Sequence, residues 1–199
     1  MNNKVKWVLL TAVFLILAGG IIIPVLSKSS EETISSIKRI NATETFSQKD
    51  KGYIVYFWQE GCSYCQQLEK SVLAYNKTGE VPLYIVDMGE KKNAASWYDW
   101  ENHHKKWDKV IGRMENGQEI INDDIDLAEL INDKRVSWSV QEGNDNKLIA
   151  VHQTPFENKA PQSAAELEIT GTPTMIKIEN GRLSSYRIGV EESAALLGK

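Results

Sequence analysis

The segment from residue 53 to residue 86 constrains the fold of this chain more than any other. It begins with YIVYFW, a run of β-branched and aromatic residues that predicts a strand buried on both faces. Apolar residues then recur at helical spacing: Cys65, Leu68, Val72 and Leu73. Residues 83–86 (LYIV) predict a second strand. We therefore expect a β-α-β unit within an α/β fold.

The only two cysteines, Cys62 and Cys65, lie at the turn between the first strand and the helix. A disulfide between them would close too short a loop to stabilise the fold much, so their pairing would serve chemistry. Backbone N–H groups at a helix N-terminus favour a thiolate. We expect Cys62 to be the more exposed and more acidic thiol, which exchanges with a substrate disulfide, and Cys65 to resolve the mixed disulfide.

Two other uses of the cysteines stay open. A metal site would need about two further ligands. His103 and His104 are the only adjacent histidines, and neighbours on a helix point in different directions. Inert structural thiols are disfavoured because an exposed turn does not bury them. No metal and no cofactor is expected.

The N-terminal segment predicts the compartment. Residues 8–26 carry no charge, and this run of nineteen residues is long enough to cross a bilayer as a helix. Lys4 and Lys6 favour a single-pass anchor with its N-terminus in the cytoplasm. A cleaved signal peptide, with Pro24 ending the helix, and a buried core helix are the alternatives. Both membrane-related hypotheses place residue 28 onward outside the cytoplasm, the second as a secreted protein.

The predicted organisation is an anchor or signal over residues 1–27, a tether over 28–33 and one folded domain over 34–199. The length and the 42% apolar content suit one such domain. The net charge of -4 argues against nucleic acid as a partner. Residues 41–51 predict a short helix. Residues 174–178 and 183–188 predict a hairpin, with a terminal helix over 191–197.

An insertion is expected over about residues 90–165, and we predict that it is mostly helical. Large side chains share one face of a predicted helix there: Trp97, Trp100, His104, Trp107 and Ile111. This face packs on the domain or, alternatively, binds a partner. The acidic run 122–126 predicts the first turn of a helix rather than a calcium loop. Residues 136–141 and 147–152 predict a hairpin.

Two stretches resemble the thioredoxin superfamily. Residues 53–65 (YIVYFWQEGCSYC) are similar to its active-site strand and turn, with Phe57-Trp58, an acidic residue and Cys-x-x-Cys in order. Residues 169–174 (ITGTPT), followed by two strands joined at Asn180-Gly181, resemble its cis-proline segment. The resemblance covers residues 37–88 and 167–198. It implies a thioredoxin fold, a central mixed β-sheet flanked by helices, with the insertion placed before the cis-proline strand.

The resemblance also implies roles for single residues. Cys62 would be the nucleophile and Cys65 the resolving thiol. Pro173 would be cis, and the backbone of Thr172 would pair with an extended substrate peptide. The residues expected to contact substrate are Thr172, Pro173, Trp58, Ser63 and Tyr64.

The chain also departs from the family pattern. Tyr56 stands where thioredoxins usually have a buried acid, so the usual proton acceptor for Cys65 is missing. Gly61 replaces the tryptophan before the first cysteine, and Ser63-Tyr64 replaces Gly-Pro. No histidine lies between the cysteines, so the strongly oxidising Pro-His type is not matched.

These observations predict a membrane-anchored, extracytoplasmic thiol–disulfide oxidoreductase. Its partners would be cysteine-containing exported proteins and a membrane or extracytoplasmic redox protein. An oxidising compartment favours an oxidase or isomerase slightly. The alternatives are an extracytoplasmic reductase and a non-enzymatic envelope adaptor that binds its partner through the insertion.

Overall fold

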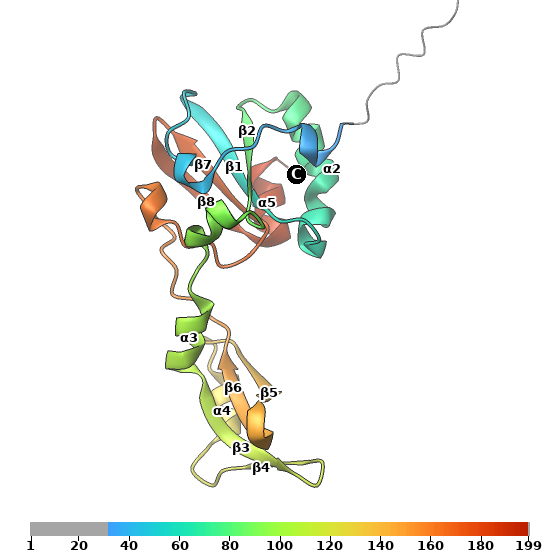
Figure 1. Cartoon of the computed structure of the whole chain (residues 1–199), viewed down its shortest axis with the longest axis vertical. Coiled ribbons are helices and arrows are strands. Elements are labelled where there is room, and N and C mark those ends of the chain that lie inside the picture. Colours follow the sequence, from blue (N-terminus) through green and yellow to red (C-terminus); the bar gives the residue numbers. More distant parts are fainter. Residues whose placement is uncertain (1–31, 199) are drawn as a thin grey trace, which may run out of the picture. The chain divides into compact units, whose positions relative to one another are not determined.

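The computed structural model describes residues 32–198, and its core sheet has four strands in the order β2-β1-β7-β8 (Figure 1). These strands are β1 (Gly52–Trp58), β2 (Leu83–Asp87), β7 (Thr174–Glu179) and β8 (Arg182–Ile188). β1 pairs in parallel with β2 and antiparallel with β7, and β7 pairs antiparallel with β8. This is the mixed central sheet that the resemblance implied, and β7–β8 is the predicted C-terminal hairpin.

β1 is buried on both faces, as its unbroken apolar run predicted. Its side chains alternate between two clusters: Tyr53, Val55 and Phe57 pack on one face, and Ile54 and Tyr56 on the other. None of the five is more than 1% exposed. The predicted helix is α2 (Ser63–Thr78), which links β1 to β2.

The two faces of the core sheet are covered differently. α2 and the terminal helix α5 (Gly189–Leu196) pack on the face that carries Ile54 and Tyr56. The opposite face is covered by segments that include short 3-10 turns: η2 (Ala42–Glu44), η3 (Lys91–Ser96) and η5 (Ala164–Glu166). η3 and η5 flank the insertion, so both of its ends contribute to the main core.

The predicted helix over residues 41–51 is wrong. Only η2 forms there, capped by Asn41, whose own backbone N–H is bound by the carboxylate of Glu44. The hydroxyl of Tyr53 donates to the carbonyl of Thr45 at 2.9 Å, a tertiary contact that the local sequence does not predict. Before it, η1 (Ile34–Ser36) leads into residues 38–40, which hydrogen-bond to Ile85 of β2.

The insertion holds a second, fully antiparallel sheet, so the prediction that it is mostly helical is wrong. This insertion sheet has the order β4-β3-β6-β5. Its strands are β3 (Lys109–Glu115), β4 (Gln118–Ile121), β5 (Trp138–Glu142) and β6 (Lys147–His152). The overlooked signal is Asn116-Gly117, whose positive φ angles of 52° and 77° form the tight turn between β3 and β4. Its flanking strand, KVIGRME, lacks the strict alternation that would have predicted a strand.

The helices of the insertion are short. α3 (Trp100–Trp107) ends before Ile111, which lies fully buried in β3, so the predicted helical face did not extend that far. A helix does follow the acidic run, as α4 (Leu127–Asn132), but the run is not its first turn: Asp126 caps the helix by accepting the N–H of Glu129, and residues 122–125 lie before it. The predicted hairpin is confirmed as β5 and β6, joined through η4 (Asn144–Asn146).

The predicted anchor or signal over residues 1–27 and most of the tether lie outside the described residues. Between residues 32 and 198, no helix is both long and apolar enough to cross a membrane.

Candidate active site: a dithiol beside a cis-proline

The turn after β1 places the two cysteines at the start of α2. Gly61 has a φ of +76°, a left-handed conformation that glycine adopts without steric cost. The tryptophan usual at this position in the family would strain this backbone. Cys62 then caps α2: its sulfur accepts the N–H of Cys65 at 3.1 Å.

The two thiols are free and have different surroundings. Cys62 is partly exposed, whereas Cys65, one turn deeper, is 1% exposed. Burial by itself would raise the pKa of Cys62, but hydrogen bonds from the Cys65 thiol, from the Thr172 side chain and from the amides of Cys65 and Tyr64 lower it below its ordinary value. Burial, followed by the hydrogen bond to Cys62, raises the pKa of Cys65 to about 11. The expected order of exposure and acidity is confirmed.

The cis-proline segment, residues 169–173, lies next to Cys62. The Thr172–Pro173 bond is cis, the geometry that the resemblance implied. The carbonyl of Thr172 accepts the thiol of Cys62 at 3.3 Å. The carbonyl of Pro173 is bound by the N–H of Gly189 at 2.8 Å, which ties the segment to the start of α5.

A groove of about 620 Å³ runs beside this segment. Its lining comes from α2, the cis-proline segment and the start of α5: Tyr64, Gln67, Gly171, Thr172, Pro173, Ile188, Gly189, Val190, Glu191 and Glu192. Sequence reasoning had singled out three of these residues, Tyr64, Thr172 and Pro173. It missed the contribution of α5, because no local pattern shows which helix end meets the cis-proline. Glu191 and Glu192 add two carboxylates to the groove.

Trp58 and Ser63 are not part of the groove lining. Trp58 ends β1, and the guanidinium of Arg39 lies over its ring, 5.3 Å from the ring centroid. Arg39 also pairs with Asp87 at 2.6 Å. Ser63 is the first residue of α2. Their contact with substrate stays a prediction.

Tyr56 occupies the position of the family's buried acid, but it cannot replace that acid. Its phenol is fully buried, and its hydroxyl lies near the Cys65 thiol, with which it interacts. Burial, and then the charge of the nearby Cys65 thiolate, raise the pKa of Tyr56 well above its ordinary value. The phenol therefore stays protonated at physiological pH and cannot take the proton of Cys65.

Among residues 32–198, no group of three or more His, Cys, Asp or Glu side chains is arranged to hold a metal ion. What the site does offer is a partly exposed thiol of lowered pKa, a buried partner thiol and a backbone segment beside them. Together with the mixed sheet, these features define a dithiol redox site on a thioredoxin-like fold.

The comparison with known families agrees with this class. A family model described as a thioredoxin-like domain matches residues 41–197, and the chain belongs to this family. No curated protein sequence matches the chain. The family assignment therefore rests on the match to the domain model.

Solved thioredoxin structures share low identity with the chain. Mitochondrial thioredoxin 3 from Saccharomyces cerevisiae is 13% identical, with 82% of this chain and 93% of that chain covered and a TM-score of 0.39. A mutant thioredoxin from Halobacterium salinarum is 12% identical, with 81% and 85% covered and a TM-score of 0.39. At these scores the similarity carries no argument about activity.

Proposed function

We propose that this protein is a thiol–disulfide oxidoreductase that acts outside the cytoplasm on cysteine-containing exported proteins. One observation carries the proposal. The sulfur of Cys62 is partly exposed, accepts a helix N–H at 3.1 Å and lies 3.3 Å from the Thr172 carbonyl. An attacking or leaving thiolate is therefore stabilised next to backbone with which an extended peptide can pair.

In the oxidising direction, the exchange takes two steps. A substrate thiolate attacks Cys62 in the Cys62–Cys65 disulfide, so that a mixed disulfide forms and Cys65 leaves as a thiolate. A second substrate thiolate then attacks the substrate sulfur of the mixed disulfide, which releases Cys62 as a thiolate and closes the substrate disulfide. The pair gains two electrons, and a redox partner protein must remove them before the next turnover.

The surroundings of the dithiol support the oxidase or isomerase direction over the reductase alternative. Hydrogen bonds that stabilise the Cys62 thiolate stabilise the reduced pair, and a stabilised reduced pair is more oxidising. Cys65 must lose its proton both when a reductase resolves its mixed disulfide and when a partner re-oxidises an oxidase. Its raised pKa of about 11 therefore does not separate the two directions.

The proposed location rests on the sequence of residues 8–26, whose uncharged run suits a single-pass anchor. A secreted form after signal cleavage would place the same dithiol outside the cytoplasm. An oxidising compartment also suits a dithiol that donates disulfides.

The reduction potential of the Cys62–Cys65 pair tests the direction. It is measured on the full chain in detergent by equilibration with glutathione. We expect a value between about -120 and -180 mV, the range of oxidases and isomerases. A value near about -270 mV would make the protein a reductase. Failure of the two cysteines to pair would refute the exchange mechanism.

Trapping of mixed disulfides tests the substrate class. We expect Cys65→Ser to accumulate exported proteins as mixed disulfides on Cys62, because the resolving thiol is gone. Cys62→Ser is the matched control and should accumulate none. Captured proteins that are all cytoplasmic would contradict the proposed location. Full function of Cys62→Ser in cells would favour the adaptor alternative.

A further inference from the structure

The residues where the chain enters the insertion bind the cis-proline segment directly. The N–H of Tyr98 donates to the carbonyl of Ile169 at 3.0 Å, and the N–H of Ile169 donates to the carbonyl of Ser96 at 2.8 Å. Trp97 and Ile169 form an isolated parallel bridge. The first residue of the cis-proline segment is thus held by residues outside the core sheet.

Trp100 extends this contact towards the dithiol. It is the first residue of α3, and its indole Nε1–H donates to the carbonyl of Thr170 at 3.0 Å. Thr172 follows two residues later, and its carbonyl accepts the thiol of Cys62. One continuous chain of contacts therefore runs from α3 through the cis-proline segment to the nucleophile.

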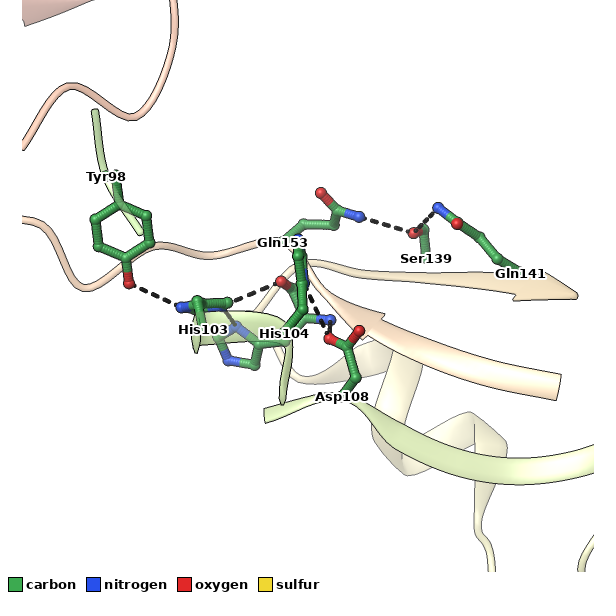
Figure 2. Close-up of polar contacts among 8 residues, drawn as sticks. Tyr98, His103, His104, Asp108, Ser139, Gln141 and Gln153 are labelled. Carbon is green, nitrogen blue, oxygen red and sulfur yellow. Dashed lines mark hydrogen bonds and ion pairs between the residues drawn. The ribbon is translucent and has the colours of Figure 1, made fainter. Parts of the chain in front are cut away.

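Trp100 is itself held by aromatic and polar contacts at the start of the insertion, where Tyr98, His103, His104 and Asp108 lie close together. Its ring lies 5.1 Å from the ring of His103 and stacks on that of His104 at 5.3 Å. Figure 2 shows the hydroxyl of Tyr98 directed at Nδ1 of His103, a distance of 2.8 Å, and His104 next to Asp108. These contacts fix α3 from several sides.

The same network joins the two chain segments that link the insertion to the core sheet. Tyr98 lies in the segment that enters the insertion, and Phe156 lies in the segment that leaves it. The hydroxyl of Tyr98 accepts the N–H of Phe156 at 3.1 Å. That hydroxyl can then donate to Nδ1 of His103, which leaves Nε2–H of His103 to donate to Nδ1 of His152 at 2.9 Å. His103 and His152 are 4% and 3% exposed, so this arrangement is well shielded from water.

We propose that Trp100 is a positioning residue for the exchange site: through Thr170 it holds Thr172 in place against Cys62, and the network of Tyr98, His103 and His152 holds Trp100. This inference rests on the proposed function, and it gives the insertion a direct influence on the dithiol.

The expected consequence is a weaker substrate site with little change in the chemical step. Without the indole N–H, the carbonyl of Thr170 loses its partner and the cis-proline segment gains freedom. Pairing of the Thr172 backbone with an extended peptide becomes weaker. The contacts of Thr172 with Cys62 loosen too, so the pKa of Cys62 shifts.

The test compares Trp100→Phe with Trp97→Phe in the full chain in detergent. Both variants keep an aromatic ring and remove one indole N–H bond of similar length, because Nε1 of Trp97 donates to the carbonyl of Met88 at 3.1 Å. Two readouts are used: kcat and KM for a fluorogenic decapeptide with one internal disulfide, and the pH profile of Cys62 alkylation by iodoacetamide.

We expect Trp100→Phe to raise KM about 3- to 10-fold, the typical effect of one hydrogen bond, with kcat almost unchanged. Its alkylation profile should shift along the pH axis relative to the wild type. Trp97→Phe should match the wild type in both readouts, because the bridge to Ile169 is made by backbone groups of Ser96 and Tyr98 that the substitution keeps. Tyr98→Phe, which removes only the hydroxyl at the network, should move both readouts in the same direction by a smaller factor.

Equal effects of Trp97→Phe and Trp100→Phe would overturn the inference, since they would indicate general loosening. Unchanged readouts in Trp100→Phe would overturn it as well. If the wild type fails to turn over the peptide, the proposed function fails, but the alkylation profiles still decide whether Trp100 influences Cys62.

Discussion

The core sheet and the insertion sheet are stabilised in different ways. The core sheet separates two clusters of 12 and 10 buried apolar residues, one on each face. The insertion sheet has one cluster with three buried members, Ile111, Leu148 and Ala150, and its other packing partners are only partly buried. α4 contributes no buried residue. The insertion therefore relies less on apolar burial than the core does.

Around His152, where the insertion joins the core, the chain instead uses aromatic and polar contacts. The rings of Trp107, Trp138 and Phe156 lie between 4.8 and 5.9 Å from that of His152. The backbone N–H of His152 donates to Asp108 at 2.9 Å. Such a network depends on the protonation state of its histidines, whereas an apolar core does not. The difference predicts that the two regions respond differently to mutation and to acid.

The largest effect is expected in the core sheet. Phe57→Ala removes a side chain that is 0% exposed in β1, and it should destabilise the whole domain by about 3–5 kcal/mol. Urea denaturation followed by tryptophan fluorescence measures this change. Val110→Ala, at a site that is 53% exposed in the insertion, is the control and should change stability by less than about 0.5 kcal/mol. Equal effects of the two variants would show that burial of Phe57 in β1 does not stabilise the domain as proposed.

A smaller and local effect is expected in the insertion. Leu148 is 2% exposed in β6, and Leu148→Ala should cost about 2–5 kcal/mol of local stability. Because the cluster around Leu148 does not include the core sheet, amide hydrogen exchange should accelerate in β3 to β6 while β1 and β7 keep their protection. Equal loss of protection in β1 would show that the two sheets unfold as one unit.

The smallest effect is expected from acid. Burial, and then repulsion from His103, lower the pKa of His152, while the nearby Asp108 acts in the opposite direction and His104 adds to the lowering. A histidine in the unfolded chain titrates near about pH 6.5. As the pH falls below that value, the unfolded state binds a proton that the folded insertion resists, so the insertion loses stability.

Hydrogen exchange at pH 7 and pH 5, corrected for intrinsic rates, measures this acid effect. Protection in β6 should fall more than protection in β1. His152→Gln, which cannot be protonated, is the control and should show a smaller pH dependence. A larger fall in β1 than in β6 would contradict the role given to the histidine pair.

Local patterns predicted the parts of the fold that depend on neighbouring residues. The strand, turn and helix around Cys62 followed from apolar spacing, and the β7–β8 hairpin followed from Asn180-Gly181. The helix over 41–51 did not form, and Tyr53 of β1 binds the carbonyl of Thr45 there, a tertiary contact that no local pattern predicts. β3 and β4 were missed because their apolar pattern is weak, although the Asn116-Gly117 turn was readable.

The sequence by itself determined the dithiol, its place at a helix N-terminus and the strands around it, because propensity, periodicity and turn chemistry act over short stretches of chain. Only the tertiary structure decided that Thr172 lies against Cys62, that α5 completes the groove and that Trp100 binds Thr170. These contacts join residues far apart in sequence, and they depend on how sheets and helices pack rather than on any local pattern.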